Sequence, residues 1–332
     1  MRSEAFRPPV RLAIFVGHCA FAIAATFAAS SPAHARNPNC SFSITAVNFG
    51  TIDLTANTTF DTTGTLQATC RGDNNTTMRV CPNFANGTGG STTGDPRFML
   101  NGTTQLNYNL YSDAARTTVW GSHLDGFAST PPTIDIPLNG SGNGSANVTI
   151  YGRIWAAQQT RPPGSYSSAF SGTNSRISYN HSTAGSCATI GTTNATNTAF
   201  TVSATYSAVC QITTALLDFG SAGVLNAAKT GSSTLTATCS ATTPYSISLN
   251  GGNSGATNPT QRKMSKSSET ITYGLYRDSG FTQAWGSTIG TNTQGGTGSG
   301  LGQPYTVFGH VPAQATPSAG AFTDTIIATT TY

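Results

Sequence analysis

The stretch NLYSDAARTTVWG, Asn109–Gly121, returns later in the chain as GLYRDSGFTQAWG, Gly274–Gly286. Four further blocks match in the same order: the cysteine that opens each copy, a Phe-Gly pair, LQATC against LTATC, and YGRI against FGHV. Matched blocks in a fixed order indicate that one domain occurs twice in this chain.

Each copy shows short segments in which apolar and polar residues alternate, and neither copy shows a helical period. Many short strands separated by glycine- and asparagine-rich turns are typical of a β-sandwich, so we expect an all-β protein. The strands expected in the first copy are 43–49, 65–69, 106–111 and 148–154. Those expected in the second copy are 235–239, 245–249, 271–276, 305–311 and 323–332.

Residues 1–35 are predicted to be a secretory signal peptide. Three arginines precede an apolar run, and Ala-His-Ala at 33–35 is a small-residue cleavage site. A lipoprotein and a retained membrane anchor are the alternatives, although Cys19 lacks the small-residue context of a lipidated cysteine. No second long apolar run follows.

Composition argues against nucleic acid as a partner. Without the three arginines and one glutamate of the signal peptide, 13 basic and 11 acidic residues remain. A nearly neutral chain is a poor match for a phosphate backbone. Only 8% of all residues are charged, and Thr, Ser, Asn and Gly take their place, which suits an exported β-protein.

The six cysteines that follow the signal peptide predict disulfides, because their number is even and the chain is exported. Six cysteines allow 15 pairings in principle, but the repeat narrows them. Cys40 and Cys70 are 30 positions apart and Cys210 and Cys239 are 29 apart at matching places, which predicts two equivalent bridges. Cys81 and Cys187 have no counterpart in the second copy and are expected to pair with each other.

The matched blocks resemble the spore coat protein U domain, as found in archaic (Csu-type) chaperone–usher pili. The resemblance lies in the opening cysteine, the Phe-Gly pair, TATC, LYxD…WG, the aromatic-Gly block and the final Thr-Tyr. It implies an immunoglobulin-like pilin that lacks its last strand and exposes an apolar groove. A periplasmic chaperone would fill this groove first, and the next subunit's N-terminal strand would fill it after an outer-membrane usher takes over.

The alternating segment FTVSATY, Phe200–Tyr206, gains a role from this resemblance. Ordinary subunits carry such a segment before the first cysteine and donate it to a neighbour. Here it lies between the two copies, so we expect it to complete the first domain, with Phe200, Val202, Ala204 and Tyr206 pointing into the core. The expected domains are then 36–207 and 208–332; the alternative is that this segment is the first strand of the second domain.

The two ends lead to the expected function. Only four residues separate Ala35 from Cys40, and they form no alternating strand. The second sandwich is expected to lack its last strand and to offer the chaperone Ile326, Ala328, Thr330 and Tyr332. A subunit that accepts a strand and donates none is expected at the pilus tip, as an adhesin on the surface of a Gram-negative cell. A structural subunit and a secreted coat or matrix protein are the alternatives.

One loop of the first copy is a candidate surface-binding site. Trp120 and Tyr151 are 31 positions apart, whereas Trp285 and Phe308 are 23 apart, and the extra positions are rich in apolar residues. Exposed apolar loops often mark interaction sites. The resemblance to archaic tip adhesins implies hydrophobic loops that engage apolar surfaces, so Phe127, Ile134 and Ile136 are the expected contacts. The alternative is that this segment forms an extra strand packed inside. Segments 83–100 and 161–163 are further candidates.

The sequence gives little sign of catalysis. His123, His181 and His310 lack metal-ligand spacing, and neither a GxSxG elbow nor a phosphate loop occurs. Scattered aspartates could still meet in space as a carboxylate pair. Asp113 and Asp278 recur in both copies, which favours a turn role. We therefore expect no enzyme, no metal and no cofactor.

Overall fold

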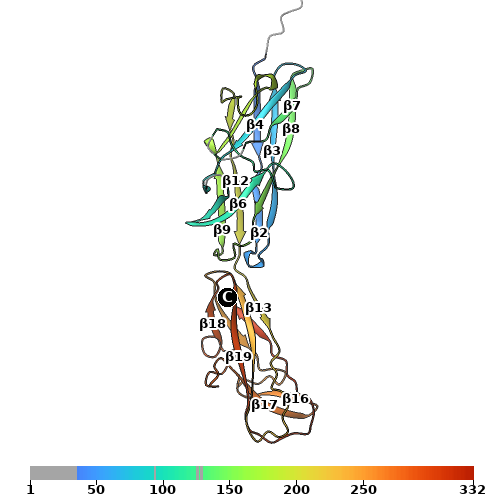
Figure 1. Cartoon of the computed structure of the whole chain (residues 1–332), viewed down its shortest axis with the longest axis vertical. Coiled ribbons are helices and arrows are strands. Elements are labelled where there is room, and N and C mark those ends of the chain that lie inside the picture. The colour runs from blue at the N-terminus through green and yellow to red at the C-terminus, as the bar shows by residue number, and fades with distance from the viewer. Residues whose placement is uncertain (1–35, 93–94, 125–126, 128–129) are drawn as a thin grey trace, which may run out of the picture. The chain divides into compact units, whose positions relative to one another are not determined.

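The computed structural model describes residues 36–92, 95–124, 127 and 130–332, so the predicted signal peptide lies outside the described residues (Figure 1). Within these ranges, no helix has the length and apolar character needed to cross a membrane. The secondary structure is almost entirely β. The exceptions are three short 3-10 helices, η1 (Leu54–Ala56), η2 (Gly172–Asn174) and η3 (Ser182–Ala184).

The first sandwich consists of an eight-stranded and a four-stranded sheet. The larger sheet has the order β1 (Asn39–Ile44), β3 (Phe60–Arg71), β8 (Asn143–Ile154), β6 (Thr104–Tyr111), β5 (Arg97–Asn101), β9 (Gly164–Phe170), β12 (Phe200–Tyr206) and β2 (Val47–Ile52). The smaller sheet has the order β11 (Ala195–Asn197), β10 (Ser175–His181), β4 (Thr77–Phe84) and β7 (Ile134–Pro137). Side chains from both sheets share one hydrophobic core.

The second sandwich is smaller, with a five-stranded and a three-stranded sheet. The larger sheet has the order β13 (Cys210–Thr214), β14 (Lys229–Cys239), β19 (Gly302–Val311), β17 (Glu269–Tyr276) and β16 (Arg262–Lys266). The smaller one has the order β18 (Gln294–Thr297), β15 (Pro244–Leu249) and β20 (Ala328–Thr331). The second sandwich has its own hydrophobic core, separate from that of the first.

Alternation of side chains produces these sheets. Along β12 the residues with odd and even numbers face opposite sides, and only one set is buried. The inner half of β14 behaves in the same way, with Leu235, Ala237 and Cys239 buried. The all-β sandwich expected from the alternating pattern is therefore confirmed.

A buried arginine and a buried tryptophan anchor each sandwich at matching places. One terminal nitrogen of Arg97 donates to the carbonyls of Phe84 and Trp120, at 2.7 and 2.6 Å. The equivalent nitrogen of Arg262 donates to the carbonyls of Leu249 and Trp285, at 3.1 and 2.8 Å. Burial lowers the pKa of Arg97 to about 10, and its donors are satisfied by carbonyl and amide oxygens. These arginines satisfy loop carbonyls in both cores.

The repeated aspartates stabilise turns. The Asp113 carboxylate accepts bonds from the backbone N–H groups of Thr117 and Thr118, and these bonds hold its pKa below the usual range. Asp278 makes the equivalent bonds to Thr282 and Gln283. The turn role expected from their recurrence is observed.

Three disulfides link the six cysteines in the expected pairs. Cys40–Cys70 and Cys210–Cys239 join directly opposed residues of the first strand pair in each sandwich. Cys81–Cys187 joins β4 to the loop after β10 and encloses the longest segment, with a sequence separation of 106.

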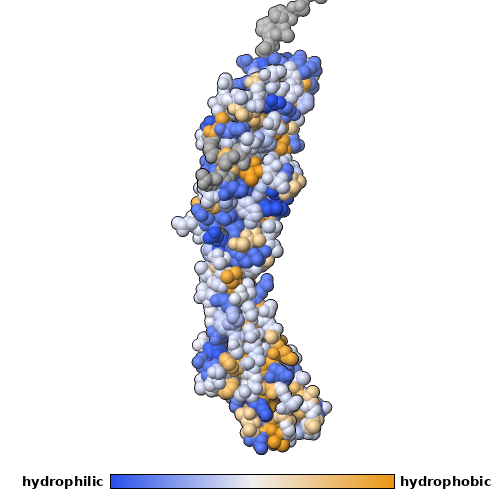
Figure 2. Space-filling view, in the orientation of Figure 1, coloured by the Kyte–Doolittle hydropathy of each residue, from blue (hydrophilic) through white to orange (hydrophobic). Residues whose placement is uncertain are grey.

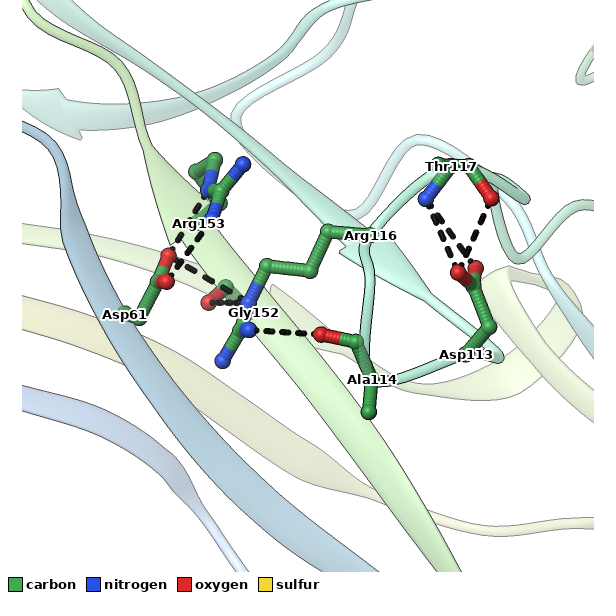
Figure 3. Close-up of polar contacts among 7 residues, drawn as sticks. All are labelled: Asp61, Asp113, Ala114, Arg116, Thr117, Gly152 and Arg153. Atoms are coloured by element: carbon green, nitrogen blue, oxygen red, sulfur yellow. Dashed lines mark hydrogen bonds and ion pairs between the residues drawn. The ribbon is translucent and has the colours of Figure 1, made fainter.

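The outer face of β3 and β8 carries a charged cluster that the second sandwich lacks (Figure 3). Asp61 accepts two bonds of 2.8 Å from Arg153, and Arg116 lies 3.3 Å from the same carboxylate. In the first sandwich Asp61 lies opposite Arg153. At the matching positions of the second sandwich Thr230 lies opposite His310, so the acidic residue is replaced by a threonine.

Candidate functional site

Strand β12 fills a gap between two strands of the first sandwich. It runs antiparallel to β9, with Phe200 opposite Phe170 and Val202 opposite Ser168. On its other side it runs parallel to β2, with Val202 opposite Val47. Because β2 and β9 do not pair with each other, β12 is the strand that joins them into one sheet.

The inward side chains of β12 belong to the first core. Phe200, Val202, Ala204 and Tyr206 are 6%, 0%, 2% and 1% exposed. The Phe200 ring stacks on Phe170, with ring centres 4.6 Å apart, and its centre lies 5.0 Å from that of Phe84. The outward residues Thr201 and Thr205 are exposed.

One wall of the same gap is present in the second sandwich. The backbone N–H of Ala215 donates to Thr234, as Thr45 donates to Thr65 just before β2. Three residues later in each copy, the side chain of Asp218 or Asn48 accepts a 2.8 Å bond from a glycine N–H. That glycine, Gly220 or Gly50, has a φ of 69° in both copies. Residues 215–220 therefore occupy the position at which β2 begins in the first sandwich.

The other wall is also present. Thr323 bridges to Ser265 of β16, as Ser167 of β9 pairs with Leu100 of β5. Residues 322–326 therefore match the inward and outward positions of β9. The strand that follows this wall is also equivalent, because Thr330 pairs with Ile247 as Ile177 pairs with Pro82.

Between these two walls the second sandwich has an open groove of about 660 Å³. We call it the acceptor groove. Its walls include Leu217, Phe219 and Ile326, and its floor includes Leu235 and Leu275. No strand of the described chain lies between the two walls.

The missing strand leaves apolar side chains partly uncovered. Val47 is 0% exposed beneath β12, whereas Leu217, its counterpart in the second copy, is only half-buried. Among the described residues, all the large hydrophobic side chains that are strongly exposed belong to the second copy: Leu216, Val224, Ile289, Leu301, Ile327 and Tyr332. Figure 2 shows prominent apolar surface over the second sandwich.

Two polar side chains of the groove lining, Tyr273 and Asp324, pair with each other. The Tyr273 hydroxyl donates to Asp324 at 2.6 Å, and Asp324 also accepts a bond from the Asn253 backbone N–H. Burial and this hydrogen bond raise the pKa of Tyr273 above its usual range, so the phenol stays protonated as the donor. These two groups already satisfy one another, and apolar side chains such as Leu217, Phe219 and Ile326 line the groove beside them.

The predicted chaperone-contact residues lie along the end of this region. Ile326 lines the acceptor groove. Ala328 and Thr330 lie in β20, which pairs with β15 on one side only and is an edge strand. Tyr332 is 59% exposed. The structure therefore places all four beside unpaired backbone or the groove, and their contact with a chaperone stays a prediction.

The prediction that Phe127, Ile134 and Ile136 form an exposed surface-binding site is wrong. Phe127 is 2% exposed and lies under Arg97, whose guanidinium carbon is 3.8 Å from the ring centre. Ile136 is 1% exposed, and Ile134 packs partly buried against the core in β7. The alternative of an extra inner strand is the one observed, because β7 pairs with β4 and adds a place for apolar residues. Residues 125–126 and 128–129 of this loop lie outside the described residues.

The other candidate segments are also largely packed. Phe84 and Met99 are 0% exposed and Phe98 is 8% exposed. Segment 161–163 is half-buried, and Pro162 accepts a 2.6 Å bond from the Tyr166 hydroxyl. Apolar residues beside glycines favoured an exposed loop in the sequence analysis, but in the structure these apolar side chains fill the first core.

No group of three or more His, Cys, Asp or Glu side chains in the described part of the chain could hold a metal ion. We did not predict from the sequence that segments 215–220 and 322–326 form the two walls of one groove. Each wall contains a recognisable sequence feature: the Phe-Gly pair lies in the first, and the segment AFTDTII covers the second.

Comparison with known proteins agrees with the repeat. The sequence model of the Spore Coat Protein U domain matches residues 23–173 and 196–329, most of the chain. The second match starts before β12, although β12 pairs inside the first sandwich. No curated protein matches the chain.

One solved structure shows a similar fold. The chain is similar to a chain in the crystal structure of the CsuC–CsuE chaperone–tip adhesion subunit pre-assembly complex from archaic chaperone–usher Csu pili of Acinetobacter baumannii. The TM-score is 0.50 and the identity 15%, over 89% of this chain and 100% of that one. The CupB6 tip adhesin of Pseudomonas aeruginosa matches with a TM-score of 0.35 and 12% identity, over 90% and 94%. By the extent of the domain match, this chain belongs to the Spore Coat Protein U domain family.

Proposed function

We propose that this protein is the tip subunit of an archaic chaperone–usher pilus, joined to the fibre through its second sandwich. The observation that carries the proposal is the contrast between one filled gap and one open gap at matching places. Strand β12 fills the first, and the acceptor groove of about 660 Å³ is the second. An extended strand from another chain would add backbone hydrogen bonds to both walls and place alternate side chains in the groove.

The tip position is supported by how the chain uses β12. This strand is paired on both sides within its own chain and is not free to fill a neighbour's groove. A subunit that receives a strand while keeping its own ends the fibre in one direction. The similar crystal structure concerns a chaperone–tip adhesion subunit complex, which agrees with this place.

The first partner of the groove would be a periplasmic chaperone, followed at an outer-membrane usher by the next subunit's strand. Until filled, the groove leaves apolar side chains and unpaired strand edges in water, which is an aggregation hazard. Export through the periplasm to the cell surface follows from this role.

The test is capture of the exported protein from its native periplasm, with and without a charge in the groove. Ile326 lines the groove and Ile327, its neighbour, is 59% exposed and points away. Ile326→Asp is expected to abolish the chaperone complex, and Ile327→Asp is expected to preserve it. If both variants bind equally well, the groove is not the docking site.

A structural tip subunit without a receptor is the second candidate, because the predicted apolar binding residues are buried. Soluble full-length protein that inhibits attachment of piliated cells to a surface would favour an adhesin. Normal attachment at saturating protein would favour the structural role.

A further inference from the structure

The three tryptophans of this chain differ in their surroundings. The indole N–H of Trp120 donates to Pro82 at 2.8 Å, and that of Trp285 donates to Ile247 at 3.0 Å. Both are buried core residues. Trp155 is half-buried, and its indole N–H donates no hydrogen bond to a described residue. It lines a shallow pocket of about 440 Å³ in the first sandwich, together with Asp95, Asn107 and Gln158.

The loop that carries Trp155 is fixed. The Gln158 amide donates to the carbonyls of Asn107 and Trp155 and accepts a 2.7 Å bond from the Asn107 N–H. The N–H of Ala157 donates to the Asn57 side chain at 2.8 Å, and Ala157 has a φ of 62°, which is uncommon for a residue with a side chain. These bonds fix the backbone of the loop that presents Trp155 before any ligand arrives.

The carboxylate in this pocket is oriented from inside the core. Asn109, 0% exposed, donates to one oxygen of Asp95 at 2.7 Å, while its own oxygen accepts from the buried Arg97. Within the described residues, the second oxygen of Asp95 accepts no hydrogen bond, and the side-chain amide of Asn107 forms none. Asp95 itself is exposed, so this second oxygen faces solvent and is accessible to a ligand.

The second sandwich shows that folding does not need these groups. Gln314 makes the same three bonds, to Thr272 and to the carbonyl of Pro312, so the loop scaffold is shared. Yet Pro312 takes the place of Trp155, Gly274 that of Asn109 and Thr260 that of Asp95. The ligand-type groups are therefore an addition to a scaffold that works without them.

We propose that this pocket binds a neutral pyranose sugar, stacked by its apolar C–H face on the Trp155 indole. Its hydroxyls would donate to Asp95 and exchange bonds with Asn107, which offers both a donor and an acceptor. The Asp95 carboxylate disfavours an anionic ligand, and the nearby Arg97 guanidinium offsets the charge that a cation would need. The proposal concerns the first sandwich alone and does not rest on the acceptor groove.

The three indole N–H groups make the test self-controlled. The purified exported protein, labelled with ¹⁵N, is titrated with methyl β-D-glucoside, methyl β-D-galactoside and the methyl glycoside of N-acetylglucosamine. Choline chloride serves as the cation probe. The Trp155 signal is identified by its loss in Trp155→Phe. It is expected to shift saturably with at least one sugar, with a Kd of about 1 mM for a ligand of this size, while the other two signals stay fixed.

Two variants sharpen the result. Asp95→Asn is expected to weaken binding about tenfold, because the amide offers one acceptor and no charge. Asp135→Asn, at an aspartate paired with Arg79 elsewhere on the surface, is expected to change nothing. The proposal is overturned if no sugar shifts the Trp155 signal saturably, if all three indoles shift together, or if only choline binds. The wild-type titration decides these outcomes even if a variant does not fold.

Discussion

The two sandwiches share a scaffold and differ in whether their gap is filled. Both contain a buried arginine, a tryptophan that bonds a strand carbonyl, and a glycine with a φ of 69° at the start of one gap wall. In the first, β12 closes the gap and Val47 is fully buried. In the second, Leu217 at the same place is half-buried and lines an open groove. One sequence repeat thus gives a self-sufficient domain and one that lacks a strand.

The first way to break this comparison is to spoil the filled gap. Val202→Asp is expected to unfold the first sandwich, with a loss of more than about 4 kcal/mol, because it buries an unpaired carboxylate between β2 and β9. Calorimetry of the full chain should show the first transition lost and the second retained. Thr201→Asp, on the exposed face of the same strand, is the control and should change stability by less than about 0.5 kcal/mol. Equal effects would mean that β12 is not part of the first core.

The disulfides test how each sandwich is closed. Removing Cys81–Cys187, with a separation of 106, should cost the first sandwich about 4.8 kcal/mol in the chain-entropy model. Removing Cys210–Cys239, with a separation of 29, should cost the second about 3.6 kcal/mol. Thermal unfolding of the two alanine double mutants measures the difference. A larger loss in the second sandwich would contradict this order.

The comparison can also be sharpened by filling the second gap. Thr330 pairs with β15 as Ile177 pairs with β4, so residues 180–206, with Cys187→Ser, can be appended after Tyr332 in matching register. The added strand should raise the unfolding temperature of the second sandwich by about 5 °C or more. It should also prevent chaperone binding. The same extension with Val202→Asp in the appended copy is the matched control and should do neither.

How much of this could be read from sequence depends on the range of the signal. The repeat, the alternating strands and the cysteine spacing are local patterns, and they led to the all-β sandwiches and the bridges observed. The partners of Phe200–Tyr206 are set by tertiary pairing between residues far apart, and only a family resemblance suggested them. Burial of Phe127 depends on Arg97, which reaches it from another strand, so its local sequence gave the wrong answer. The Trp155 pocket also joins distant segments and leaves no local pattern.

The smallest expected effect is the pH-dependent contribution of Asp61 to the stability of the first sandwich. Arg153, by its hydrogen bonds to the carboxylate, and Arg116, by its charge, hold the pKa of Asp61 below its usual range (Figure 3). A carboxyl whose pKa is lower when folded stabilises above its unfolded pKa of about 3.9, and this contribution fades as pH falls through the folded pKa. Asp61→Asn should therefore cost the first sandwich up to about 1 kcal/mol at pH 7, since the pair is partly exposed and screened. The difference from wild type should shrink as pH falls below the unfolded pKa of about 3.9. The second sandwich, with Thr230 at this place, should not respond to the substitution. Unfolding temperatures of both proteins between pH 7 and pH 2 measure this. A difference in unfolding temperature that stays constant with pH would show that the Asp61 carboxylate acts by packing and not by charge.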